Sequence, residues 1–301
     1  MRIVSLLPSA TEIVCALGLR ENLVGVTHEC DYPAGVERLP PVTQTLIPTD
    51  ATSSEVDRLV REQMAQEPAL YRLDVQRLVA LAPDLVITQE LCQVCAVPGS
   101  QVAEACDRLT DRPRLLNLSP MTLAGVFQSF LEVGAAADVL EVAQALADRL
   151  RGRVADVVSQ VADLPRPRTV LLEWLDPPFS AGHWNPELIR LAGGIDGLNQ
   201  EGLPSRQLEW CEVIDFAPEV IVVACCGYDR ERAQQDLPIA EAVPGWNELP
   251  AVRHRRVHVL DGSQFFNRPG PRLVESVERL AAVIHPSVKR TVGPYDTPSS
   301  Y

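Results

Sequence analysis

Short apolar runs alternate with amphipathic stretches along most of the chain. The first run, Ile3–Leu7, has the length and character of a strand buried inside a parallel sheet. Ser9, with Glu12 three residues later, forms a capping-box pattern that predicts a helix ending at Gly18. Further strands are predicted at Leu23–Thr27, Asp84–Thr88, Leu115–Leu118, Thr169–Glu173, Val220–Ala224 and Val257–Leu260. Ser53 or Ser54 is predicted to cap one helix, a second is predicted over Val75–Leu81, and a third is predicted to begin at Asn185. This alternation predicts βα units with a mainly parallel sheet.

One pattern occurs in both halves of the chain. The segment RLVALAPDLVIT (77–88) matches EVIDFAPEVIVV (212–223) in its order of features. Each predicts a short helix, a proline that ends it, an acidic residue and a buried strand. Together with the strand–helix–glycine order in both halves, this repeat predicts two similar α/β lobes.

A long helical stretch separates the two halves. One amphipathic helix is predicted over Thr122–Gly134 and a second over Asp138–Asp163. At 1.5 Å per residue the second would be about 35–40 Å long, enough to bridge two lobes, although it could instead pack inside one domain. The bridge is the favoured interpretation. The predicted domains are a first lobe at 1–120, a helical segment at 121–165, a second lobe at 166–288 and a polar tail at 289–301.

The charge balance excludes some partners. The net charge is −13 and no basic stripe interrupts the acidic surface, so nucleic acid is not an expected partner. No run approaches the roughly 20 apolar residues that span a bilayer, so no membrane insertion is expected. Pro8 and Glu12 interrupt the first apolar run, and no cleavage site follows it. A cytoplasmic location is therefore predicted; a misassigned start would make the protein periplasmic.

Sequence motifs typical of enzymes are missing from the chain. It has no G-x-S-x-G elbow, H-E-x-x-H pair or P-loop, and the first predicted βα turn lacks G-x-G-x-x-G. A binding protein is therefore expected rather than an enzyme.

Four segments carry a resemblance to a known family: LLPSATEIVCALG, RLVALAPDLVIT, the long inter-lobe helix and WLDPPFSAGHWNPELIRLAGG. Their order resembles that of cobalamin-binding proteins related to the periplasmic vitamin B12 receptor of ABC importers, over residues 1–286. The resemblance implies two Rossmann-like α/β lobes joined by a long rigid α-helix, the helical-backbone periplasmic-binding-protein fold. It also implies a cobalamin, other corrinoid, heme or iron chelate held in the inter-lobe cleft, and an ABC transporter permease as partner. The expected role is the substrate-binding component of ABC-type uptake or an intracellular ligand carrier. The chain departs from the family in its start and in its cysteine-containing strings HECDYP and TQELCQVCAV.

The predicted ligand site follows from a rule for open α/β sheets, in which ligands bind beyond the carboxyl ends of the strands. Flat aromatic side chains in such loops suit a large ring ligand such as a corrin, although they could instead seal the lobe against the linker helix. The candidate ligand-binding residues are Pro8, Ser9, Thr11, Tyr32, Gln89, Trp174, Phe179, His183, Trp184, Tyr228, Phe265, Phe266 and Arg268.

A second chemistry is suggested by cysteine and histidine. Cys92 and Cys95 form a C-x-x-C pair, and His28 and Cys30 follow a neighbouring predicted strand. These four could hold zinc or an iron–sulfur cluster, which makes a cytoplasmic metalloprotein or enzyme the alternative function. The pair could also be a redox dithiol, and buried thiols that merely pack remain the favoured interpretation. His28 or His183 could further ligate cobalt or iron from above a ring plane, or simply form loop hydrogen bonds.

Overall fold

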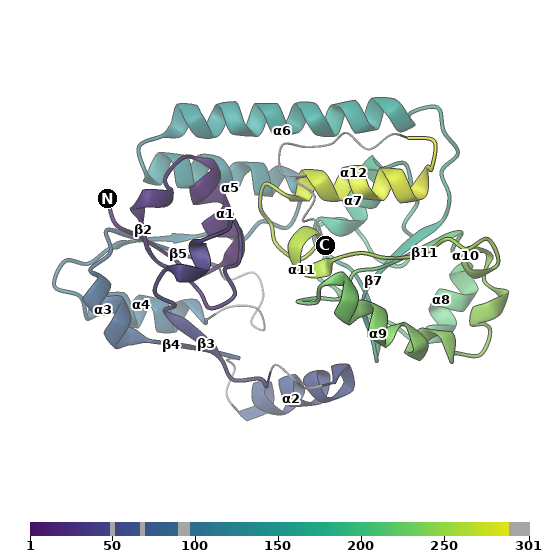
Figure 1. Ribbon diagram of the computed structural model, residues 1–301, viewed down its shortest axis with the longest axis horizontal. Coiled ribbons are helices and arrows are strands. Elements are labelled where there is room, and N and C mark those ends of the chain that lie inside the picture. The colour runs from purple at the N-terminus through teal and green to yellow at the C-terminus, as the bar shows by residue number, and fades with distance from the viewer. Residues whose placement is uncertain (49–51, 67–69, 90–96, 289–301) are drawn as a thin grey trace. The chain divides into compact units, whose positions relative to one another are not determined.

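The chain folds as two compact units. The computed structural model describes residues 1–48, 52–66, 70–89 and 97–288 (Figure 1). The first unit comprises Met1–Arg149 and the second Leu150–Tyr301. The boundary falls inside α6 (Leu140–Val161), the helix predicted over 138–163.

A parallel sheet forms the centre of the first unit. Its strand order is β2-β1-β5-β6, and every neighbouring pair is parallel. Ile3, Val4, Val86 and Ile87 are fully buried in it, as expected of strands covered on both faces. A separate antiparallel pair, β3 and β4, lies between β2 and β5 in the chain. The elements are β1 (Ile3–Ser5), α1 (Pro8–Ala16), η1 (Arg20–Asn22), β2 (Leu23–Gly25), η2 (Val36–Arg38), β3 (Thr43–Thr45), α2 (Ser53–Gln66), β4 (Tyr71–Leu73), α3 (Val75–Leu81), β5 (Leu85–Thr88), α4 (Gly99–Asp107), β6 (Arg114–Asn117) and α5 (Leu123–Ala136).

A mixed sheet forms the centre of the second unit. Its order is β11-β10-β7-β8-β9. Strands β11, β10 and β7 are parallel, β8 pairs antiparallel with β7, and β9 pairs antiparallel with β8. The elements are β7 (Thr169–Leu175), β8 (Pro178–Ser180), α7 (Asn185–Leu191), β9 (Arg206–Gln207), α8 (Trp210–Phe216), β10 (Val220–Val223), α9 (Arg230–Glu241), η3 (Trp246–Glu248), α10 (Pro250–Arg253), β11 (Val257–Val259), α11 (Gly262–Phe265) and α12 (Leu273–Ile284).

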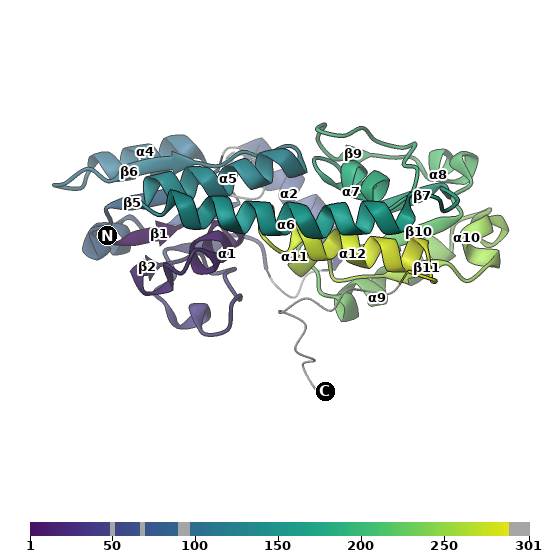
Figure 2. The same cartoon turned by 90° about the horizontal axis from the view of Figure 1, so that it is seen from above.

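Helix α12 packs beside the second-unit part of α6 (Figure 2). A bidentate ion pair joins them: Arg153 Nε and Nη2 donate to the two carboxylate oxygens of Glu278 at 2.9 and 2.7 Å. The Glu278 side chain is only 3% exposed, so its charge is held within the fold by this arginine.

The repeat found in the sequence is a structural repeat. Helices α3 and α8 each end at an alanine in the left-handed conformation, Ala82 at φ 42° and Ala217 at φ 47°. Each alanine donates its backbone N–H to the carbonyl three residues earlier, and a proline then prevents the helix from continuing. Strands β5 and β10 follow in matching positions. The predicted duplication of this segment is confirmed.

An arginine before the first strand of each unit strengthens the repeat. Arg2 donates its backbone N–H to Asp84 and its Nε to the carbonyl of Leu81, at the end of α3. Arg168 donates its backbone N–H to Glu219 and its Nε to the carbonyls at the end of α8. In both units, therefore, the acidic residue after the proline accepts a hydrogen bond from the backbone N–H of the arginine. The guanidinium of the same arginine donates to carbonyls at the end of the helix.

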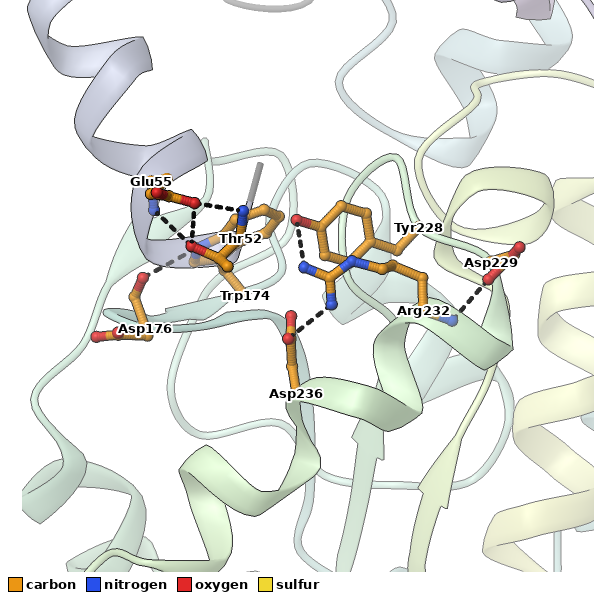
Figure 3. Close-up of polar contacts among 8 residues, drawn as sticks. All are labelled: Thr52, Glu55, Trp174, Asp176, Tyr228, Asp229, Arg232 and Asp236. Carbon is orange, nitrogen blue, oxygen red and sulfur yellow. Dashed lines mark hydrogen bonds and ion pairs between the residues drawn. The ribbon is translucent and has the colours of Figure 1, made fainter. Parts of the chain in front are cut away.

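Two predicted helix caps are wrong, although α2 does begin at Ser53. Helix α1 takes Leu7 as its N-cap and Pro8 in its first turn, so Ser9 lies inside the helix and does not cap it. Proline suits this position because its fixed φ is helical and its missing N–H would have no partner there. Helix α2 is preceded by Thr52, not capped by Ser53 or Ser54: Thr52 donates its N–H and hydroxyl to Glu55, whose own N–H donates to Thr52 Oγ1 (Figure 3).

Candidate functional site

The first-unit residues predicted to bind ligand follow β1, β2 and β5. These strands are parallel neighbours, so their carboxyl ends meet at one edge of the sheet, here called the carboxyl edge of the first unit. Pro8 and Tyr32 are half-buried there, and Gln89 is buried. Ser9 and Thr11 lie in α1 and are also buried.

Polar groups on this edge bond to one another. The Thr11 hydroxyl donates to Ser5 Oγ at 2.9 Å and lies 3.0 Å from Cys30 Sγ. Ser5 Oγ in turn donates to the carbonyl of Leu7. Since Thr11 is fully buried and its hydroxyl is already used, these contacts favour a structural role for Thr11 over ligand contact.

The predicted metal set is not supported. His28 Nδ1 lies 2.8 Å from Thr43 Oγ1, and its ring lies against Tyr71, with 5.3 Å between centroids. Cys30 is buried against Thr11, while Cys92 and Cys95 lie outside the described residues. Within the described part of the chain, no group of three or more histidine, cysteine or acidic residues is arranged to hold a metal ion.

The carboxyl edge of the second unit, where β7, β10 and β11 end, brings two predicted aromatic residues together. Trp174 lies near the end of β7 and Tyr228 follows β10, which pairs with β7 in parallel register. Their ring centroids are 5.0 Å apart with 44° between the ring planes, and both side chains are half-buried. Phe179, also half-buried, is the register partner of Trp174 on β8. The Trp174 indole donates to the carbonyl of Asp176 at 3.1 Å, which fixes its orientation.

An arginine and an aspartate extend this pair (Figure 3). The Arg232 guanidinium lies 4.5 Å from the centroid of the Tyr228 ring, in cation–π geometry, and donates to Asp236 at 2.7 Å. Asp229 caps α9 by accepting the backbone N–H of Arg232 at 2.7 Å. Neither Arg232 nor Asp236 was predicted from the sequence. The i, i+4 spacing of residues 228, 232 and 236 after a predicted strand was the signal that could have identified them.

Other predicted aromatic residues have packing contacts. The Trp184 indole donates to the carbonyl of Phe266 at 2.8 Å, and the two side chains are 3% and 0% exposed. This burial favours a packing role over ligand contact for both Trp184 and Phe266. Phe265 is half-buried, with the Arg279 guanidinium 3.6 Å from its ring centroid. Arg268 donates to Ser263 Oγ at 3.1 Å.

His183 is held in an unusual backbone conformation. Its φ is 57°, its N–H donates to Leu203 at 2.6 Å and its carbonyl accepts from Gly202 at 2.9 Å. Burial lowers the pKa of the His183 imidazole, so the ring is neutral at neutral pH and keeps a nitrogen lone pair. Ligation of a bound metal by this ring stays a prediction.

Two adjacent cysteines follow β10 on the same edge. Burial raises the pKa of Cys225 to about 12, so this residue is a thiol at neutral pH and not the thiolate that binds metals. Cys226 is exposed, and its backbone N–H donates to the carbonyl of Glu173 at 2.9 Å. Its exposure makes it a chemical reporter of this edge.

The chain belongs to the periplasmic binding protein family, whose pattern matches residues 3–263. Membership of this family makes it a solute-binding protein and not an enzyme. Among the described residues, no helix is both long enough and apolar enough to cross a membrane.

Named relatives cover nearly the whole chain. It is 26% identical over 298 residues to the uncharacterized ABC transporter substrate-binding lipoprotein YvrC of Bacillus subtilis, covering 95% of this chain and 80% of that protein. It is 26% identical over 288 residues to the vitamin B12-binding protein of Vibrio cholerae, covering 94% of this chain and 88% of that protein.

Solved structures share the fold. The periplasmic vitamin B12 binding protein BtuF of Vibrio cholerae gives a TM-score of 0.67 at 24% identity, with 94% of this chain and 96% of that chain covered. A periplasmic heme binding protein from Pseudomonas aeruginosa gives 0.73 at 22% identity, with 97% and 95% covered. The predicted periplasmic-binding-protein fold is confirmed.

Proposed function

We propose that this protein is the substrate-binding component of an ABC importer, and that its ligand is a corrinoid or a related tetrapyrrole or metal chelate. Membership of the periplasmic binding protein family and the relatives named for ABC transport and vitamin B12 support the class. The observation that supports a ring-shaped ligand is the Trp174–Tyr228 pair on the carboxyl edge of the second unit.

The aromatic pair suits a ring ligand for physical reasons. Half-buried rings offer apolar area to a flat ligand while their hydrogen-bonding atoms stay anchored to the protein. Trp174 is oriented by the Asp176 carbonyl and Tyr228 by the Arg232 guanidinium. Because both side chains are already fixed, ring binding sacrifices little conformational entropy. The expected cleft between the lobes stays a prediction.

Direct titration tests this function. Full-length protein is titrated with cyanocobalamin and, separately, with hemin, and the absorbance of the ligand and the tryptophan fluorescence of the protein are followed. We expect saturable binding of at least one ring at micromolar concentration or below. Bound ring should also slow alkylation of exposed Cys226 by iodoacetamide, measured by peptide mass spectrometry. Absence of saturable binding with both rings would overturn the ligand proposal.

The importer role and an intracellular carrier role differ in location. The permease of an importer meets its binding protein outside the cytoplasmic membrane, whereas an intracellular carrier acts inside the cell. Fractionation of the native cells, followed by immunoblotting, separates the two. Detection of the protein in the cytoplasm alone would contradict the importer role and leave the carrier role.

A further inference from the structure

We infer that the carboxyl edge of the second unit selects ring ligands by charge, favouring uncharged or cationic rings with carboxamide substituents over rings with carboxylates, and that Asp236 is the determining residue. This inference rests on the proposed function, because it specifies which ring the same edge accepts.

The first step is the state of the arginine beside the aromatic pair. The Arg232 guanidinium lies 4.5 Å from the centroid of the Tyr228 ring, and its side chain is 29% exposed. Asp236, one helical turn along α9, accepts its Nη1 hydrogen bond at 2.7 Å and is only 11% exposed. A charge-assisted bond of this length at a largely buried position balances the positive charge of the guanidinium locally. Arg232 and Asp236 therefore form an ion pair whose two charges balance each other on this edge.

The second step concerns the other charges on this edge. The carboxyl group of Asp261, the N-cap of α11, lies within electrostatic range of Arg268 and Arg272, so these cations also have an acidic neighbour. Asp229 acts on the same carboxyl group as a like charge. Glu173 and Asp176 add two carboxylates at the end of β7.

The third step is what a ligand meets. A propionate on a ring would approach Arg232 with the Asp236 carboxylate beside it and Asp176 and Asp229 on the same edge, so repulsion offsets the attraction of the guanidinium. A carboxamide brings no charge. Its oxygen can accept from Arg232 and its NH₂ can donate to Asp236, so both halves of the pair are used. The edge thus discriminates between rings in two ways: it repels carboxylate substituents and it forms hydrogen bonds with carboxamide substituents.

Matched probes test this selection. Dissociation constants are measured for cyanocobalamin, for its monocarboxylic acid with one propionamide hydrolysed, and for hemin, which carries two propionates. We expect the intact amide ring to bind at least about tenfold more tightly than either carboxylate probe. In Asp236→Asn this preference should fall by about tenfold, through tighter binding of the carboxylate probes.

Asp215→Asn is the control, because it removes the same charge from an exposed position near the end of α8, close to where β10 begins. It should leave the preference unchanged. A salt series on the wild-type protein needs no variant: the preference should shrink between about 0.05 and 0.5 M NaCl, as screening weakens repulsion.

The outcomes separate the two proposals. If no ring binds, the proposed ligand class fails and the charge selection fails with it. If rings bind but the wild-type protein prefers the carboxylate probes, or if neither Asp236→Asn nor salt changes the preference, the charge selection alone is overturned.

Discussion

The two units are alike where their parallel strands begin and different where those strands end. At the amino ends, Arg2 with Asp84 and Arg168 with Glu219 make equivalent bonds around equivalent left-handed alanines. At the carboxyl ends, the first unit has buried polar groups that hydrogen-bond to one another, as in the bond from Thr11 to Ser5. The second unit has the half-buried Trp174–Tyr228 ring pair there, beside an arginine–aspartate pair.

This difference assigns separate roles to the amino and carboxyl ends of the parallel strands. The repeated bonds at the amino ends satisfy helix-end carbonyls, which every βα unit of this kind must do whatever it binds. The carboxyl ends can differ more because ligands bind at this end of an α/β sheet, and different ligands require different side chains. Changes at the amino ends should therefore alter stability alone, and changes at the carboxyl end of the second unit should alter binding.

The largest expected effect is on binding at the carboxyl edge of the second unit. Trp174→Ala should weaken ring binding by about 10–100-fold, because it removes a fixed aromatic face. Trp174→Phe, which keeps a flat ring, should retain most of the affinity. His28→Ala, at an exposed position on the carboxyl edge of the first unit, should change the affinity for the ring by less than about threefold. Fluorescence or absorbance titration measures all three, and a larger loss in His28→Ala than in Trp174→Ala would reverse the assignment.

A smaller effect is expected on stability at the amino ends. Arg2→Ala and Arg168→Ala should each lower the free energy of unfolding by about 1 kcal/mol, because α3 or α8 loses a partner for its terminal carbonyls. Arg38→Ala, whose side chain is 87% exposed, should cost almost nothing. Urea unfolding measures the change. Ring affinity should be unaffected, and a tenfold loss of affinity in Arg168→Ala would contradict the separation of roles.

The smallest expected effect tests the left-handed alanines. Ala82→Gly and Ala217→Gly should each raise the free energy of unfolding by about 0.5 kcal/mol, because glycine adopts positive φ without steric strain. Ala80→Gly, exposed inside α3 two residues away, should lower it by about 1 kcal/mol. Equal changes at positions 80 and 82 would show that the backbone conformation is not the cause.

Most of the fold could be predicted, because each element leaves a local signal. Helix α3 was predicted with its observed bounds, and β7, β10 and β11 within two residues, since apolar runs flanked by proline or glycine define them. The caps predicted at Ser9 and at Ser53 or Ser54 were wrong, because Leu7 and Thr52 occupy those positions. Several neighbouring residues there can cap a helix, and only the backbone geometry shows which one does.

The candidate site was predicted less completely. The strand-end rule identified Trp174 and Tyr228 individually, but their 5.0 Å separation depends on the pairing of β7 with β10, about 50 residues apart in the chain. The same rule also selected Trp184 and Phe266, which the fold buries against each other. Residue type and position after a strand cannot distinguish an aromatic ring that faces solvent from one that packs inside the lobe.

By itself the sequence determined the periodic elements, the duplicated helix–proline–strand segment and the class of fold, because these depend on neighbours within a few residues and on the burial of apolar runs. Only the tertiary structure decided which strand-end side chains meet, which hydroxyls and thiols are used internally, and that Arg232 carries its own counter-charge in Asp236. Those outcomes depend on which strands pair and on how much solvent each side chain retains, and neither quantity is encoded in any single local segment.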